Sequence, residues 1–272
     1  MKIHPIDLVR KGKALPSLPD IYQRFSEKLQ DPTASAVDFS NIIESDPALA
    51  LRLLRIANSV YYSFSAQITQ IPRAITVVGL QELHSMILAV SVTKVFSHLP
   101  DHLINMQKFW QDSIRCGVLA RILGASNHQK SRSTLFTAGL LLDIGSLVTY
   151  IRLPEVAKKI LVEAERQQRP QREIETKILG FDHARVGAEL INYWKLPDYL
   201  QEMVATHHQP QLAKNHPDDA TLLYHAHQLV HCKQSPPDEL SKELGLSDQI
   251  NLKEVLQEAD AQCQEIYRSV LG

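Results

Sequence analysis

Glycine and cysteine are scarce in this chain, which has 10 glycines and 3 cysteines among 272 residues. Cys116, Cys232 and Cys263 lie far apart and form no CxxC pair. This spacing argues against a disulfide scaffold and favours a reducing compartment. The chain also has no glycine-rich phosphate loop, no GxSxG sequence and no HExxH sequence. The chemistries that depend on those motifs are therefore poorly supported.

An excess of charge of one sign is also missing. Lys and Arg together number 29 against 30 Asp and Glu, which gives a formal net charge of -1. General binders of nucleic-acid backbones rely on a large positive excess, so this balance argues against that class. Met86–Val92, the most apolar run near the middle, is too short to cross a bilayer, and Met1–Arg10 lacks an apolar stretch of signal-peptide length. We therefore expect a soluble, cytoplasmic protein with no nucleic-acid or membrane partner.

Apolar residues, in contrast, recur at spacings of three and four along almost the whole chain, which is the pattern of packed amphipathic helices. Asp46-Pro47 and Asp31-Pro32 each place an N-cap acceptor before a proline at the first helical position. Asn251 and Glu254 have the spacing of a capping box. The valine-rich segment Ile87–Phe96 is predicted to be helical, because no second strand-like run could pair with it. The sequence thus predicts an all-α fold.

A series of motifs follows through the first eighty residues: Leu15–Pro19, Asp31-Pro32, Ile43–Leu49, Leu53–Ser59 and Ala74–Leu80. Within them, prolines such as Pro47, after the N-cap Asp46, fix φ at helix starts. Asn58 and Ser59 can cap a helix end and start a turn, and Gly79 permits a sharp bend. In order and spacing these motifs resemble the first half of an HDOD domain (HD-related output domain), and the similarity continues to about Pro210.

The resemblance implies a multi-helix bundle in which an N-terminal helical half, residues 15–100, packs on an HD-like helical half, residues 101–210. Residues 1–14 would form an N-terminal extension, and residues 211–272 would add C-terminal helices beyond Ser235–Pro237. The last of these helices has one apolar stripe, formed by Leu252, Val255, Ala259, Cys263, Ile266 and Val270. We expect this helix to pack on its own domain rather than on a partner.

Two acidic residues, Asp112 and Asp143, interrupt helix faces that are otherwise apolar. Buried carboxylates must pair with cations, hydrogen-bond donors or a metal, or else take up protons. Four histidines supply potential partners: His183, His207, His208 and His227. Carboxylates and imidazoles together suit a divalent Mn, Fe, Ni or Zn ion, which could activate water for attack on a phosphate ester. Each residue also has a structural alternative, since buried histidines are often hydrogen-bonded core residues and buried aspartates often cap helices.

HD-type phosphohydrolases, to which HDOD domains are related, hold metal with a His, a His-Asp dyad and a late Asp, and some branches add further histidines. The resemblance places Asp112 where the first His stands and His227 where the late Asp stands. Leu142 replaces the His of the dyad and has no donor atom. The residues that match family positions are Asp143, His183, His207 and His208. The resemblance therefore implies an altered ligand set, for which ordinary HD hydrolysis is not expected.

Three functions remain open at this stage. The first is a catalytically degenerate HD-like module of bacterial signal transduction that acts through signalling proteins bound in trans. The groove between the N-terminal helices and the HD-like half is the candidate surface. The second is a metal-dependent phosphohydrolase with an altered His/Asp ligand set. The third is a non-hydrolytic nucleotide or anion sensor that uses partly protonated histidines. The sequence does not predict an oligomeric state.

Overall fold

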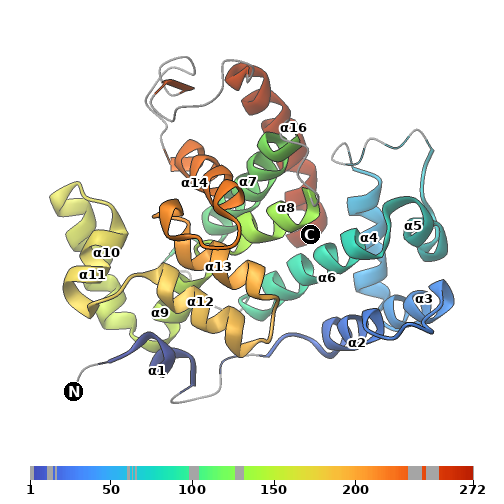
Figure 1. Ribbon diagram of the computed structural model, residues 1–272, viewed down its shortest axis with the longest axis horizontal. Helices are drawn as coiled ribbons and strands as arrows, with labels where there is room; N and C mark the ends of the chain where they lie inside the picture. The colour runs from blue at the N-terminus through green and yellow to red at the C-terminus, as the bar shows by residue number, and fades with distance from the viewer. Residues whose placement is uncertain are drawn as a thin grey trace.

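The computed structural model describes residues 3–10, 15, 17–59, 62, 64, 66–97, 104–125, 132–231, 241–242 and 251–271. Within these residues the regular structure is helical and contains no strand, which confirms the all-α prediction. The helices form a smaller N-terminal group and a larger group after it, joined in the middle by α6 (Figure 1); the larger group contains the segment that the resemblance assigns as HD-like and keeps that name. Cys232 and Ser235–Pro237 lie outside the described residues.

The N-terminal half consists of α2 (Asp20–Leu29), α3 (Ala36–Glu44), α4 (Pro47–Ala57), α5 (Ile71–Val78) and α6 (Leu80–Val95). The start of α4 is as predicted: the Asp46 carboxylate accepts a hydrogen bond from the Leu49 N–H at 3.0 Å, and Pro47 occupies the first turn. α6 includes most of the valine-rich segment, which confirms that it is helical. On α6, the ring of His84 stacks on Tyr22 of α2, with 4.9 Å between centroids.

The parallel prediction for Asp31 is wrong, because α3 begins only at Ala36. Its N-cap is Ser35, which forms a capping box with Asp38. The Asp31 carboxylate instead accepts hydrogen bonds from the Thr33 N–H and from the Lys28 ammonium, both at 2.9 Å. Asp31 therefore belongs to the turn between α2 and α3.

Asn58 and Gly79 determine the path of the chain from the end of α4 through α5 to α6. The Asn58 side chain donates to the Ile68 carbonyl and accepts from the Ile68 N–H, both at 2.7 Å. This paired contact ties the end of α4 to the segment that leads into α5. Gly79 has a φ of +92°, which favours glycine, and the chain bends by 115° there between α5 and α6. The predicted bend at Gly79 is thus confirmed.

The HD-like half is formed by α7 (Met106–Ala125), α8 (Arg132–Leu141), α9 (Ile144–Arg152), α10 (Pro154–Gln167), α11 (Gln171–Leu179), α12 (His183–Tyr193) and α13 (Asp198–Thr206). A short 3-10 helix, η1 (Pro210–Leu212), and α14 (Pro217–His231) follow, and α1 (Pro5–Arg10) packs on α12 and α9. By length and composition alone, Thr134–Arg152 could cross a membrane, and 83% of it is buried inside the fold. Core helices of globular proteins have the same composition.

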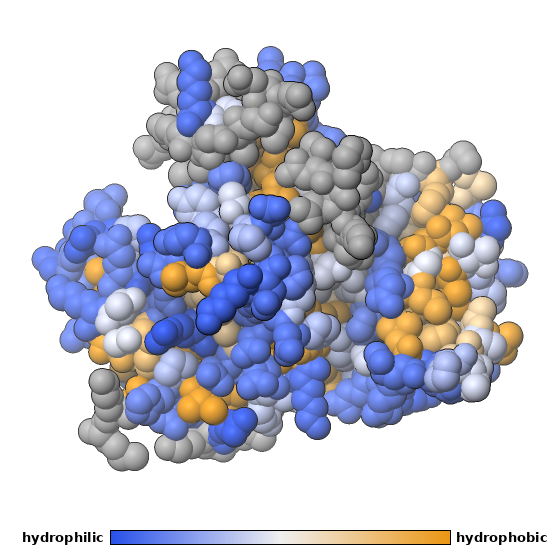
Figure 2. Space-filling view, in the orientation of Figure 1, coloured by the Kyte–Doolittle hydropathy of each residue, from blue (hydrophilic) through white to orange (hydrophobic). Residues whose placement is uncertain are grey.

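The final helix, α16 (Leu252–Leu271), runs across both halves and packs on α7, α4 and α6 (Figure 1). Its buried side chains include Leu252, Ala259, Ile266 and Val270, so the apolar stripe packs on its own domain as expected. Asn251 and Glu254 form the predicted cap at its start. Figure 2 shows hydrophobic residues gathered over the N-terminal helices α3 to α5, whereas the visible face of the HD-like half is largely hydrophilic.

Candidate metal centre

Asp143 lies in the turn between α8 and α9, directly before the first residue of α9. Its neighbour Leu142 is 1% exposed and points into the core. Two residues further on, Gly145 packs against the start of α12, where a Cβ atom would collide with the carbonyl oxygen of His183. This close approach of α9 and α12 holds the first residue of α12, His183, beside the Asp143 carboxylate.

Three imidazole nitrogens converge on one oxygen of Asp143. Its Oδ1 atom lies 3.2 Å from Nε2 of His183, 3.3 Å from Nε2 of His227 and 3.7 Å from Nε2 of His207. The other oxygen, Oδ2, lies 3.9 Å from Nε2 of His231. His208 also belongs to this group, because its Nε2 atom lies 2.9 Å from Nε2 of His183. We call Asp143 and these five histidines the His/Asp centre.

Hydrogen bonds on the far side of two rings decide which nitrogen is free. Nδ1 of His183 donates to the Glu175 carboxylate at 2.7 Å, and the same oxygen accepts the His183 backbone N–H at 2.8 Å. Nδ1 of His207 donates to the Val204 carbonyl at 2.8 Å. Whenever these two rings are neutral, the contacts place the lone pair on Nε2, which is the tautomer that a metal ligand needs. Gln171 further fixes Glu175 by donating to its other oxygen at 2.7 Å.

The donor set fits a divalent ion. Around a zinc ion with bonds of about 2.1 Å, neighbouring donor atoms lie roughly 3.0 Å apart in octahedral and 3.4 Å apart in tetrahedral geometry. The distances from His183 to His208 and to Asp143 fall close to this range. In addition, Nε2 of His207 is buried without a hydrogen-bond partner among the described residues. Buried polar atoms in native proteins normally have partners, and a cation bound at this centre would give this nitrogen one.

Two overlapping donor sets have the spacing of a metal site. One comprises His183, His207 and His208, and the other comprises Asp143, His207 and His227. Both sets use His207, which has only one nitrogen left after its bond to Val204. We therefore describe them as one site. Imidazole and carboxylate donors together suit Zn, Fe, Ni or Mn.

The electrostatics of the centre favour an ionised Asp143. Burial opposes its charge, but the charge of His227 and the hydrogen bonds from His183 and His227 outweigh burial and hold the pKa of Asp143 well below its usual range. Burial likewise opposes the charge of His183, yet Glu175 and Asp143 raise its pKa well above the usual value. Burial and the neighbouring His207 lower the pKa of His208. The centre thus contains a negative carboxylate among imidazole rings of which some favour the charged form and others the neutral form.

Five of the six sequence-predicted ligands come together in this centre, and Asp112 does not join either donor set. Asp112 lies on α7, forms an ion pair with Lys108 one turn away, and is 24% exposed. Two participants were missed from the sequence, Glu175 and His231. His231 follows His227 by four residues, a spacing that places both rings on one face of α14, so a signal for it was present.

An all-helical domain with a histidine-rich centre beside a retained aspartate defines an HD-like class of protein. The model of the HDOD domain family matches residues 15–210, and the chain belongs to that family, as the sequence resemblance implied. An uncharacterized protein of Treponema pallidum is 26% identical over 196 residues, which are 71% of this chain. The match spans only 37% of the length of that relative.

Solved structures share the fold. An HDOD domain protein of unknown function from Geobacter sulfurreducens is 21% identical, with a TM-score of 0.78 and 98% and 97% of the two chains covered. A candidate phosphohydrolase from Shewanella amazonensis is 23% identical, with a TM-score of 0.75 over 94% and 95%. A candidate signal transduction protein from Marinobacter aquaeolei is 23% identical, with a TM-score of 0.72 over 95% of this chain and 60% of that one. At these identities the likeness establishes the fold alone.

Proposed function

We propose that this protein is a non-catalytic signalling module that holds one divalent metal ion in the His/Asp centre. The observation that supports this proposal is the convergence of three Nε2 atoms on one oxygen of Asp143. His183, His207, His208 and His227 would hold the ion together with Asp143. When bound, such an ion supplies charge neutralisation and cross-links α9, α12, α13 and α14.

A structural ion is favoured over a hydrolytic one by the residues at two family positions. Leu142, where HD enzymes have a ligand, is buried and has no donor atom. Asp112, at the position of the first His, is engaged by Lys108 on its own helix. The carboxylates of Asp143 and Glu175 also disfavour an anion sensor at this centre, because they compete with an anion for the charge of His183.

Signalling proteins in trans are the partners that this proposal requires. The hydrophobic residues that gather over α3 to α5 support a protein-binding role, and Val37 and Leu51 on these helices are 66% and 58% exposed (Figure 2). The description of the Marinobacter protein as a candidate signal transduction protein agrees with this role. The near-neutral charge of the chain supports protein partners over nucleic acid.

Metal content is the direct test. The untagged protein should be reconstituted with Mn, Fe, Ni or Zn, desalted, and analysed by inductively coupled plasma mass spectrometry. We expect about one equivalent of metal per chain, lost in Asp143→Ala and retained in the matched control Asp112→Ala, which removes a carboxylate outside the donor sets. Absence of metal after reconstitution with all four ions would overturn the proposal.

A metal-dependent phosphohydrolase is the second candidate, and partial access to the centre favours it. A quarter of the Asp143 side chain and 47% of the His231 side chain are exposed, so solvent reaches the carboxylate from the side of His231. The metal-loaded protein should be assayed with p-nitrophenyl phosphate and bis(p-nitrophenyl) phosphate. Metal-dependent turnover that is lost in Asp143→Ala would replace the structural role by the enzymatic one.

A further inference from the structure

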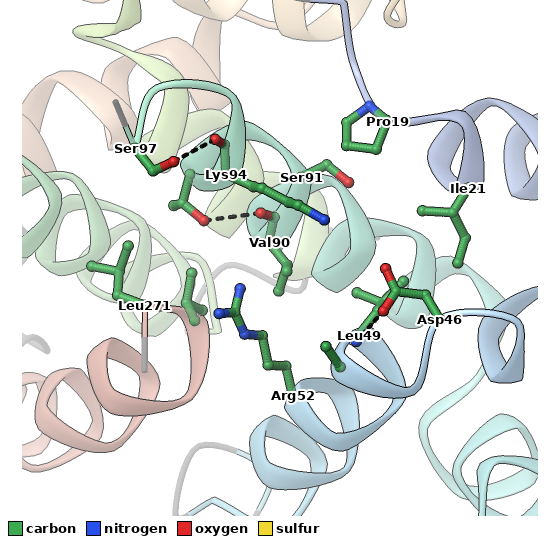
Figure 3. Close-up of a pocket in the computed structure, with 13 residues that line it drawn as sticks. Pro19, Ile21, Asp46, Leu49, Arg52, Val90, Ser91, Lys94, Ser97 and Leu271 are labelled. Atoms are coloured by element: carbon green, nitrogen blue, oxygen red, sulfur yellow. Dashed lines mark hydrogen bonds between the residues drawn. The ribbon is translucent and has the colours of Figure 1, made fainter. Parts of the chain in front are cut away.

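A pocket of about 330 Å³ lies where α2, α4 and α6 meet the C-terminal end of α16. Its apolar walls come from all four helices and include Ile21, Leu49, Val90, Val270 and Leu271. No residue of the His/Asp centre lines it. Arg52, a half-buried residue, extends its guanidinium from α4 into this space, and the exposed Lys94 extends its side chain from α6 into the same space (Figure 3).

Neither cation is paired within the part of the chain that the structure describes. There, the side chains of Arg52 and Lys94 form no ion pair and no hydrogen bond. The one carboxylate in the lining is Asp46, whose Oδ1 accepts the Leu49 N–H as the N-cap of α4. With two positive groups and one negative group, the lining carries a single net positive charge.

Each of the two cations can donate a charge-assisted hydrogen bond to an anion that enters the pocket beside the apolar wall. A small molecule with an anionic head and an apolar body can form ion pairs with the cations and pack its apolar part against the wall. One net positive charge matches a monoanion better than a phosphate monoester, which carries close to two negative charges at neutral pH. Ser91, whose hydroxyl lies on the same face of α6 as Lys94, adds a hydrogen-bond donor to the pocket (Figure 3).

We propose that this pocket binds a small monocarboxylate with an apolar body, with its carboxylate between Arg52 and Lys94. The volume is at the lower end of the range for small-molecule sites. The pocket contacts the N-terminal half through α2, α4 and α6 and contacts the end of α16 through Val270 and Leu271. A bound acid would therefore join the N-terminal half to the helix that also packs on α7 of the HD-like half.

Calorimetric titration of octanoate into the full chain tests the proposal. We expect saturable binding of one equivalent, weakened about tenfold in Arg52→Gln and in Lys94→Gln, because each variant removes one charge-assisted hydrogen bond to the carboxylate. Octan-1-ol, which keeps the apolar body without the charge, should bind at least about tenfold more weakly. Because neither cation has a partner among the described residues, both variants should unfold at the wild-type temperature.

Arg55→Gln is the matched control, since Arg55 also belongs to α4 but lines a different groove beside Asn58 and Arg268. It should bind octanoate like the wild type. Lack of saturable octanoate binding overturns the proposal, and so does equal weakening in Arg55→Gln. Tighter binding of octyl phosphate than of octanoate overturns the assignment to monocarboxylates, and equal binding of octan-1-ol shows that the cations do not recognise the head.

Discussion

At the scale of single residues, the centre depends on a carboxylate that touches no candidate metal position. Glu175 is 1% exposed and holds Nδ1 of His183, so that Nε2 faces Asp143. We expect Glu175→Gln to weaken metal binding by about 10- to 100-fold, because such outer hydrogen bonds orient a ligating ring and raise its basicity. The measurement is a competition titration with a chromophoric chelator, which reports affinity rather than activity.

Glu173→Gln supplies the control for this prediction. Glu173 lies on the same helix, is 37% exposed and pairs with Arg169 instead of a histidine. Its neutral variant should bind metal with wild-type affinity. Unchanged affinity in Glu175→Gln, or an equal loss in Glu173→Gln, would show that Glu175 does not position His183.

His84 gives the N-terminal half a dependence on pH. It hydrogen-bonds to the Ser26 hydroxyl at 2.7 Å, and burial lowers its pKa to about 4. Between pH 6.5 and 4 the unfolded chain therefore binds a proton that the folded chain does not, so stability falls as the pH decreases through this window. In urea unfolding at pH 7 and pH 5, we expect His84→Phe to reduce this loss by about 1–2 kcal/mol.

The exposed His4 offers the comparison, because its replacement by Gln should leave the pH dependence unchanged. A His84→Phe variant that loses as much stability between pH 7 and pH 5 as the wild type would rule out this role of His84.

The sequence predicted most of the residues of the centre but not what orients them. Asp143 interrupts an apolar helix face and matches a family position, and both signals are visible in the sequence alone. Glu175 lies in the charged run Gln171–Lys177, which has the composition of an exposed helix. Its burial arises only because the chain turns at Gly180 and brings the N–H of His183 onto its carboxylate. No local pattern contains that contact.

At the scale of helices, the contact of α9 with α12 determines where His183 lies. In Gly145→Ala the new methyl group would collide with backbone atoms of α12, so we expect a loss of about 3 kcal/mol in stability together with weaker metal binding. Gly79→Ala is the comparison: its strained φ should also cost roughly 1–3 kcal/mol, but a Cβ there meets no neighbouring atom. Urea unfolding and metal titration of both variants separate the two effects.

Equal metal affinity in the two glycine variants would show that the α9–α12 contact does not position the centre.

The starts of α3 and α4 show how well local sequence signals predict where a helix begins. Asp46 is the N-cap of α4 as predicted. Asp31 is not the N-cap of α3, because Ser35, four residues later, takes that position in a capping box with Asp38. The sequence offers two possible starts for this helix, and the two hydrogen bonds that Ser35 and Asp38 exchange determine that it begins at Ala36.

At the scale of the whole molecule, helical periodicity and the order of the motifs were enough to predict an all-α HDOD fold. They did not predict how distant segments meet. The Arg152 guanidinium of α9 donates to the Leu8 carbonyl of α1 at 2.7 Å, a contact across 144 residues. Such pairings follow from side-chain packing in three dimensions, which a single sequence pattern does not record.

The path of the chain therefore interleaves the two halves. It touches the HD-like half with α1, leaves to build α2 to α6, returns, and ends with α16 lying against α4, α6 and α7. No single cut in the backbone separates the halves, because α1 packs on the HD-like half and α16 packs on helices of both halves. We therefore expect the described helices of both halves to melt as one unit.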